Sequence, residues 1–448
     1  MLRLPFLRRP AGWGVLSGLV LAAPAAAADW FDLSGYQRSR IEAVSGDIRP
    51  GGSEQSAFML RTVVAARLGD GPVRLNAELW DVRAYAIAPG TRLGTGDVNA
   101  LEPVVANVAA DLRGLARRLG PGGRATITAG RMIVNVGSRR VVAAEDYRNT
   151  ISASTGLRLD LGNRQWGGSL LWIMPQQRLP DGPARVRRNA VVLDRENLDV
   201  TLWGADLVRH LHGLDLEASA FHFAEHDQPG LASRDRQLTT ASLRLLKPRN
   251  AGQWDGEVEA AWQWGAASRS ISAAAPRLPV AAWFVHADLG HSWAGPWSPR
   301  LSLVADMVSG DRPGDTIRRF DPLFGIRQPD FAPGSLYALI GRTNVMAVGV
   351  RGDMANKRSD ASISVKPMWA QSRTDQFSQS GARDPAGLSG RFAGWEMSSR
   401  VRHWLVKDRL RVEADGVLML RRGLLRNAPG LPAGDQIAYG SLSLQASF

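Results

Sequence analysis

Four arginines and one aspartate lie close together in the segment 131–148, and their chemistry is that of anion binding. The group consists of Arg131, Arg139, Arg140, Asp146 and Arg148. A guanidinium group is planar and permanently charged, so it binds carboxylates and phosphates through paired hydrogen bonds. The group therefore predicts a selectivity ring for anions, in which one carboxylate keeps the cations oriented. The alternative is a solvated face of ordinary salt bridges.

Arginine dominates the basic residues of the whole chain. Only four of the 55 basic residues are lysine, and the formal net charge is +13. The base composition of the gene is the alternative explanation for this bias. The remaining candidate pore-lining arginines are Arg61, Arg74, Arg83, Arg158, Arg300 and Arg400. We expect them to extend the ring into a ladder, with Glu78, Asp146 and Asp160 as counter-charges.

The elements that would position these side chains are about eighteen short segments of alternating polar and apolar residues. Long gaps such as 134–153, 265–279 and 310–336 follow the odd segments, whereas short gaps such as 163–165 and 406–408 follow the even ones. Short turns on one side and long loops on the other are typical of an outer-membrane β-barrel. A soluble β-sandwich has no reason to sort its loops in this way.

The alternation assigns one face of each segment to the lumen and the other face to lipid. The inward positions are heavily charged, the outward positions are almost uncharged, and Trp and Tyr gather at the segment ends, as in aromatic girdles. Barrels of about 16–18 strands leave an aqueous channel, so we expect a wet, charged interior. The last segment ends on Phe448, which fits closure on the first strand and recognition by the outer-membrane assembly machinery.

The first residues predict a cleaved secretory leader, so we expect residues 1–28 to be removed and residues 29–448 to form one all-β transmembrane antiparallel barrel. Arg3, Arg8 and Arg9 precede a short apolar stretch, and three alanines form a small-residue cleavage site before Asp29. The chain has no Cys, so its stability must come without disulfides. No later apolar run is long enough to predict a transmembrane helix.

Two motifs carry a resemblance to a known family. The first runs from Gly130-Arg131-Met132 through Gly137-Ser138-Arg139-Arg140 to Asp146-Tyr147-Arg148-Asn149-Thr150, and the second pairs Ser309-Gly310-Asp311 with Phe320-Asp321-Pro322-Leu323-Phe324. Together with Gly394-Trp395-Glu396 they resemble the alginate export family of outer-membrane proteins, in which Trp is commoner at the position of Tyr147. The resemblance implies an 18-stranded barrel with an Arg-rich pore that passes an anionic polysaccharide.

The second motif lies in the longest outside loop and has three interpretations. Its residues are Ser309, Gly310, Asp311, Phe320, Asp321 and Pro322. Asp, Gly and Pro have an ordinary role as turn residues, but the loop could also fold into the pore mouth as a gate. A Ca²⁺ site on Asp311, Asp315 and Asp321 is the third interpretation, although their spacing matches no EF-hand. The seven His residues show no tight metal spacing, so we expect no metal or other cofactor.

We therefore interpret the chain as a monomeric outer-membrane porin of a Gram-negative cell, with passive transport steered by a positive lumen. The favoured cargo is alginate or another anionic polysaccharide, moving outward with periplasmic export partners. A general or anion-selective uptake porin for small solutes is the first alternative, and a structural or adhesive barrel is the second. No local signature predicts an enzyme, and the scattered basic residues do not form a nucleic-acid-binding motif.

Overall fold

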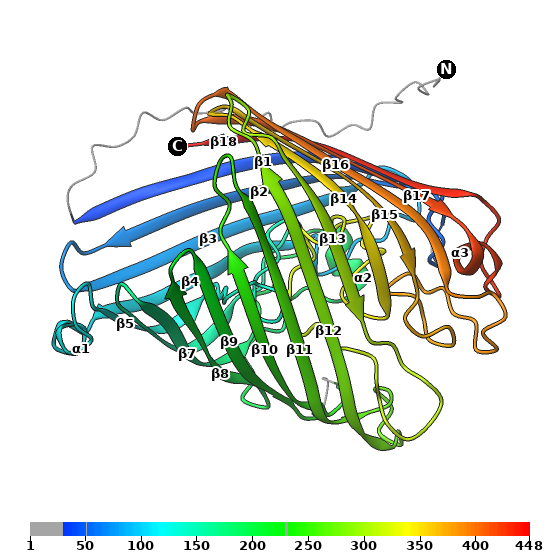
Figure 1. The fold of residues 1–448 in the computed structure, drawn as a ribbon, viewed down its shortest axis with the longest axis horizontal. Helices are drawn as coiled ribbons and strands as arrows, with labels where there is room; N and C mark the ends of the chain where they lie inside the picture. Colours follow the sequence, from blue (N-terminus) through cyan, green and yellow to red (C-terminus); the bar gives the residue numbers. More distant parts are fainter. Residues whose placement is uncertain (1–29, 51, 229–231) are drawn as a thin grey trace.

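The computed structural model describes residues 30–50, 52–228 and 232–448, and these form one closed antiparallel barrel (Figure 1). Each strand pairs with its neighbours in the chain, and β1 also pairs with β18 to close the sheet, from Tyr36 opposite Ser447 to Ser45 opposite Ala438. Closure leaves no strand edge exposed to lipid. The predicted fold is confirmed, whereas the predicted leader lies outside the described residues.

The eighteen strands and three short helices account for the wall and its ends. The strands are β1 Phe31–Ser45, β2 Gln55–Leu68, β3 Val73–Ala86, β4 Asn99–Asp111, β5 Arg124–Met132, β6 Ser154–Gly162, β7 Trp166–Pro175, β8 Val200–Leu211, β9 Leu214–Glu225, β10 Gln237–Lys247, β11 Trp254–Ser268, β12 Arg277–Ser292, β13 Arg300–Val308, β14 Val345–Ala355, β15 Ser359–Trp369, β16 Phe392–Val406, β17 Leu410–Arg421 and β18 Gln436–Ser447. The helices are α1 Arg113–Arg118, α2 Pro183–Arg187 and α3 Gly423–Asn427. None of these helices in the described part of the chain is long and apolar enough to cross a membrane.

The connections follow the predicted alternation with local differences. Tight turns such as 163–165 follow even strands, but the even strand β4 is followed by the longer connection 112–123, which contains α1. Strands β11 and β12 extend further than the alternation predicts, so the loop between them is 269–276. The loop after β13 is longer than predicted and spans 309–344.

Side chains alternate across the wall as predicted. In β3, Leu75 and Leu79 are exposed on the outer face, whereas Trp80 and Val82 on the inner face are buried. In the regular register between β2 and β3, Val82 lies opposite Arg61, which is also buried. The exposed apolar band is the surface that faces lipid.

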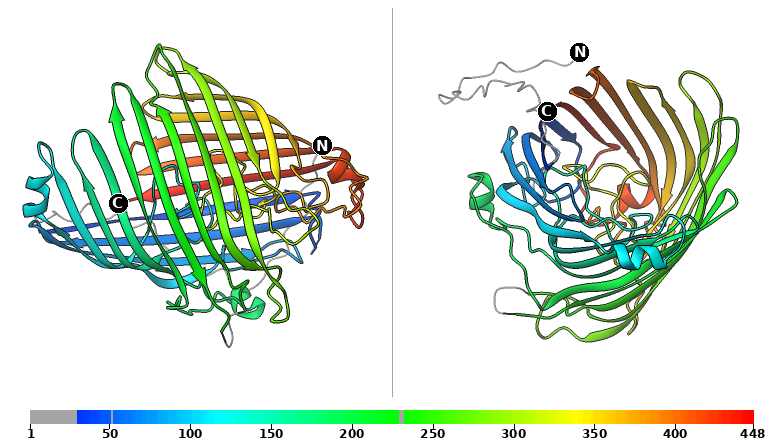
Figure 2. Two further views of the ribbon diagram at one scale, coloured as in Figure 1. Left: turned by 60° about the horizontal axis from the view of Figure 1, so that its bottom comes forward. Right: turned by 90° about the vertical axis from the view of Figure 1, so that its left-hand side faces the viewer.

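Two long loops, 133–153 and 309–344, fold into the bore and fill part of it (Figure 2). They meet at a parallel bridge between Val142 and Phe324. Phe320 packs edge to face on the inward Phe284, and Phe324 packs on the inward Phe223. The interior therefore contains an apolar core as well as charged groups, which the strand count alone does not predict.

Candidate functional site

One cluster of buried charges, the Arg140 cluster, joins both inner loops to the wall. It comprises Arg140, Glu257, Glu259, His286, Asp306, Asp330, Arg342 and Lys366. The Arg140 guanidinium lies 2.7 Å from a carboxylate oxygen of Glu257, of Glu259 and of Asp330. Arg140 belongs to loop 133–153, Asp330 to loop 309–344 and the two glutamates to β11, so one side chain connects three parts of the fold.

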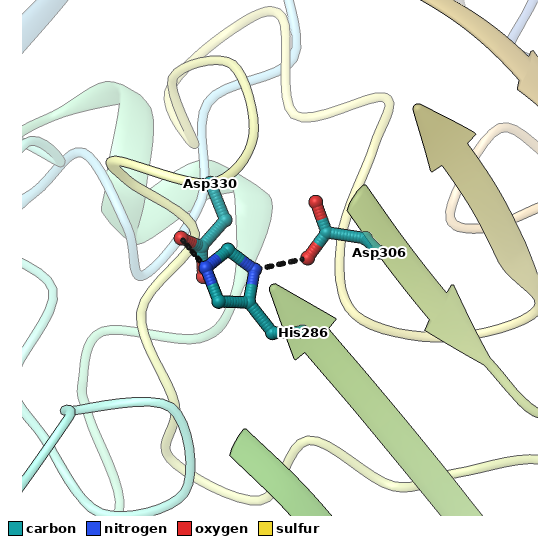
Figure 3. A group of neighbouring side chains, drawn as sticks. All are labelled: His286, Asp306 and Asp330. Carbon is teal, nitrogen blue, oxygen red and sulfur yellow. Dashed lines mark hydrogen bonds and ion pairs between the residues drawn. The ribbon is translucent and has the colours of Figure 1, made fainter. Parts of the chain in front are cut away.

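Asp330 is the second centre of this cluster. It accepts hydrogen bonds from Arg140 and Arg342, and its carboxylate lies 3.7 Å from His286 Nε2 (Figure 3). Burial alone would raise the pKa of the Asp330 carboxyl group, but the neighbouring Arg140 and His286 hold that pKa well below its usual range. Asp330 is therefore an ionised anchor for loop 309–344.

His286, Asp306 and Asp330 have the residue types of a metal site, and their ligand atoms lie within 4.8 Å of one another (Figure 3). His286 Nδ1 lies 2.8 Å from Asp306, and Lys366 Nζ lies 3.7 Å from the same carboxylate. Because arginine and lysine already balance these carboxylates, the group fits an ion-pair cluster better than a cation site. His286 is buried within this cluster.

Tyr147 and Arg61 attach the second half of loop 133–153 to the opposite side of the wall. The Tyr147 hydroxyl lies 2.7 Å from Tyr439 Oη and donates to Asp415 of β17 at 3.1 Å. Arg61 of β2 donates to Asp146 and to the backbone oxygens of residues 146, 148 and 149. These bonds fix the backbone on both sides of Arg148.

A cavity of about 370 Å³ lies beside this fixed segment, and we call it the arginine pocket. It is lined by Arg148, Arg178 and Glu145, with apolar wall from β7 and β8. Within the described residues, neither arginine lies within ion-pair distance of a carboxylate. In the described part of the chain, the Arg178 guanidinium donates only to Thr150 Oγ1, at 3.1 Å. Two guanidinium groups and the one carboxylate of Glu145 therefore line the cavity, and the lining carries net positive charge.

A third arginine, Arg327, lies next to the pocket on loop 309–344. Its backbone N–H donates to Glu145 at 3.0 Å, and its guanidinium donates to Gln379. Burial and the nearby Arg148 lower the pKa of Arg327 to about 9. The same two causes lower the pKa of Arg178 to about 10. Burial, the larger cause, disfavours a charge of either sign, whereas the repulsion from Arg148 is the part of each shift that an anion would relieve.

The predicted ladder of arginines separates into three groups. The inward members paired with carboxylates are Arg61, Arg74, Arg140, Arg158 and Arg300. Among the described residues, no carboxylate lies within ion-pair distance of Arg139, Arg148 or Arg400. The outward members are Arg83 and Arg131. The paired side chains fit the salt-bridge alternative, so a continuous ring of free cations is not what the chain builds.

Arg83 and Arg131 are corrections to the predicted lumen positions. Arg83 lies opposite Leu60 in the register, on the outer face, and pairs with Asp81 at 2.9 Å. Arg131 lies opposite Ala106 and Thr155, also on the outer face, and pairs with Glu102 and Glu196. In β3 the error arose because Arg74 and Arg83 are an odd number of residues apart, so they point to opposite faces.

The predicted counter-charges behave unequally. Asp160 pairs with Arg158 at 2.8 Å and Asp146 pairs with Arg61 at 3.0 Å. Glu78 accepts a hydrogen bond from Trp80 Nε1 and contacts no arginine within ion-pair distance in the described part of the chain. Two of the three carboxylates therefore balance an inward arginine.

The Ser-Gly-Asp and Phe-Asp-Pro motif holds loop 309–344 in place. Ser309 Oγ accepts from the backbone of Trp283, and the Asp311 backbone N–H donates to Asp375. Asp321 pairs with Arg236 at 2.7 Å, and although burial opposes it, this guanidinium lowers the Asp321 pKa. Because Asp321 is held in this way, the proposed Ca²⁺ site on Asp311, Asp315 and Asp321 is not assembled. The structural and plug interpretations both fit.

Sequence reasoning missed Arg178, Arg327 and His286. All three lie far along the chain from the residues they meet, and none belongs to a motif. For the two arginines the available signal was weak, namely a place on a long loop with no acidic residue at a fixed spacing. Arg178 and Arg327 approach Arg148 only where loops 176–199 and 309–344 meet loop 133–153, and His286 of β12 meets Asp330 of loop 309–344.

Comparison with known proteins assigns the family. The model of the family described as "Alginate export" matches residues 30–431. None of the curated proteins compared with the chain matches it. Similar solved structures include OccAB1 of Acinetobacter baumannii, with a TM-score of 0.57, 11% identity, and coverage of 94% of this chain and 97% of that one.

OccK2 (OpdF) of Pseudomonas aeruginosa, solved in complex with glucuronate, is a second similar structure. Its TM-score is 0.56 at 12% identity, with 93% of this chain and 98% of that chain covered. At such identity these likenesses show the fold, an outer-membrane porin barrel, and not the cargo. With the family match across nearly the whole barrel, this chain belongs to the alginate export family and is an outer-membrane channel, not an enzyme.

Proposed function

We propose that this channel passes an anionic polysaccharide, with alginate as the favoured cargo, outward and by passive diffusion. The observation that carries the proposal is the arginine pocket, where Arg148 and Arg178 form no ion pair within the described residues and outnumber the one lining carboxylate, Glu145. Positive charge that lines a pore and is not neutralised attracts anions and repels cations. Delivery from the periplasm by export partners belongs to the same proposal.

The paired charges of the lumen support a polymer as cargo. A polyuronate carries a carboxylate on every residue, so it would bind too tightly to a continuous row of free arginines. In this barrel most inward arginines are balanced, for example Arg158 by Asp160 and Arg300 by Asp255 and Asp288. Weak binding at a few places allows entry and also release, which conduction requires.

Uptake of small organic anions is the second candidate function. It is favoured by the filled bore, because loops 133–153 and 309–344 leave a cavity of about 370 Å³ beside them, a size suited to a small ligand. The similar barrel OccK2 was solved with glucuronate, a single uronate. Both candidates require anion selectivity, but they differ in the length of the cargo.

The experiment is the reversal potential of the purified protein in a planar bilayer under a KCl gradient, followed by addition of uronate polymer or monomer. We expect anion selectivity and block by the polymer, both weakened in R148Q/R178Q. The control is R83Q, which changes an arginine on the outer face and should leave both readouts unchanged.

The other outcomes are equally informative. Block by glucuronate monomer with no effect of polymer would favour the uptake porin. Cation selectivity, or a double variant that behaves like the wild type, would contradict the role of the pocket. A barrel with no conductance would favour the structural or adhesive alternative.

A further inference from the structure

Loop 176–199 begins at the arginine pocket, which Arg178 lines, and then continues on the outer side of the wall, where it has three anchors. The Asn189 side chain bonds both backbone groups of Ala84 in β3, at 2.8 and 3.1 Å. Asp194 accepts from the Leu179 backbone and from Asn99 Nδ2, at 2.8 and 3.0 Å. Glu196 accepts from Arg131, Thr155 and Gln176, at 2.7 to 2.9 Å. The loop is therefore a fixed part of the surface and not a free extension.

The third anchor shows which side of the wall the loop occupies. Arg131 and Thr155 lie opposite each other in the register, on the face of Leu157, which is half exposed toward lipid. Figure 2 agrees, since its right-hand view places α2 on the outer side of the first strands. The loop thus crosses the extracellular ends of β3 to β7 from outside the bore.

Around the anchors, the loop exposes apolar and basic side chains. Val191, Leu193 and Leu198 are 53%, 50% and 72% exposed. The exposed arginines are Arg185, Arg187, Arg188 and Arg195. Within the described residues, no carboxylate lies within ion-pair distance of any of the four. An ordered loop on a soluble surface would gain nothing from three exposed aliphatic side chains.

The aromatic residues beneath the loop place it at the membrane interface. Trp172 and Trp203 are exposed on the outer face near the extracellular ends of β7 and β8. Exposed Trp on a barrel wall marks the level of the lipid headgroups. Aliphatic side chains at this level with arginines beside them match the boundary between acyl chains and phosphate.

We infer that loop 176–199 binds a phosphate-bearing lipid of the outer leaflet, with Arg185 and Arg187 of α2 and the following Arg188 on the phosphate, and with Val191, Leu193 and Leu198 against its acyl chains. Arginine suits this role because its planar fork binds phosphate through two hydrogen bonds. A polyuronate entering or leaving the bore is also anionic, but it has no apolar part to cover the three aliphatic side chains. The lipid is therefore the better match.

The test uses the full-length protein purified in detergent and native mass spectrometry with two probes, lipid A with both phosphates and lipid A without phosphate. We expect the wild type to retain the phosphorylated probe selectively. In R185Q/R187Q/R188Q the affinity should fall roughly a hundredfold, from about a factor of five for each arginine at the headgroup level. R185K/R187K/R188K should keep most of the binding.

The chain provides a matched control at the other end of the barrel. Helix α1 also exposes three arginines, Arg113, Arg117 and Arg118, but it lies in a connection on the short-turn side. R113Q/R117Q/R118Q should retain the lipid like the wild type. Heat-modified mobility on a gel confirms that each variant is a folded barrel.

Three results would overturn the inference. The first is that the wild type binds both lipid probes equally. The second is that the α2 and α1 variants lose the phosphorylated lipid to the same extent. The third is that the α2 variant keeps the lipid but loses binding of poly-uronate, which would assign the surface to the polymer. Because the arginine pocket is not altered in any of these variants, the outcome is independent of the proposed cargo.

Discussion

Arg140 and Arg148 lie on the same inner loop, yet their surroundings are opposite. Arg140 contacts three carboxylates at 2.7 Å and lies at the centre of a balanced cluster. Arg148 shares a cavity with Arg178 and, among the described residues, has no carboxylate within ion-pair distance. A balanced arginine holds loops in place, whereas an unbalanced one remains available to a passing anion. The same residue type thus serves structure and selectivity in one segment.

The largest expected effect comes from breaking the balanced side with D330N. Arg140 would keep Glu257 and Glu259, but Arg342 would lose its one carboxylate partner among the described residues, and an unpaired buried charge costs about 3–5 kcal/mol. We expect the lost stabilisation to release loop 309–344 locally and to leave the wall folded. The measurements are single-channel conductance, which should rise, and proteolysis of the loop, which should become faster.

A matched control for D330N is D288N. Asp288 pairs with the buried Arg300 at 2.5 Å, but that pair joins wall strands only. The D288N substitution should lower barrel stability without raising conductance.

Because the pKa of Asp330 is held well below its usual range, the contribution of its carboxylate to holding loop 309–344 is complete above about pH 4. This contribution is lost only as pH falls through the folded pKa. Wild-type conductance should therefore stay constant at mildly acid pH.

A second change makes the arginine pocket resemble the Arg140 cluster. In T150D, a carboxylate replaces the hydroxyl that accepts from Arg178, so one free guanidinium becomes paired. A charge a few ångströms from the ion path contributes about 1 kcal/mol, and the ratio of anion to cation permeability should fall about fivefold. T150S should leave this ratio unchanged, and equal ratios for T150D and wild type would contradict the role of Arg178.

Alkaline pH should reduce the same selectivity without a mutation. The pKa of Arg327 is lowered to about 9 and that of Arg178 to about 10, so their charge is complete at neutral pH and is lost as pH rises through these values. Reversal potentials measured from pH 7 to 11 should show anion selectivity decline from about pH 8 upward. In R327Q the early part of this decline should disappear.

The smallest effect is expected on the outer face. Arg83 and Asp81 form a partly exposed ion pair, and such pairs contribute about 0–1 kcal/mol. R83Q should therefore change the melting temperature little and leave the reversal potential as in the wild type. A shift in selectivity would show that the strand register assigned to β3 is wrong.

The alternation of polar and apolar residues determined the barrel by itself, because a transmembrane wall must satisfy its backbone internally and present apolar side chains to lipid. The motif from Gly130 to Thr150 also pointed to the loop that carries Arg140 and Arg148. For Arg83 and Arg131, by contrast, the predicted face was wrong. Because the side chains of a strand alternate with a period of two, an error of one residue in parity assigns a side chain to the lumen that in fact lies on the outer face.

Only the tertiary structure decided which arginines are balanced. Arg140 meets Glu259 and Asp330 from distant parts of the chain, and Arg178 meets Arg148 only because loop 133–153 is fixed by Arg61 and Tyr147. Strand alternation is a local property that each segment expresses alone. Whether a buried charge finds a partner depends on how the loops pack inside the closed wall, and no spacing along the sequence encodes that contact.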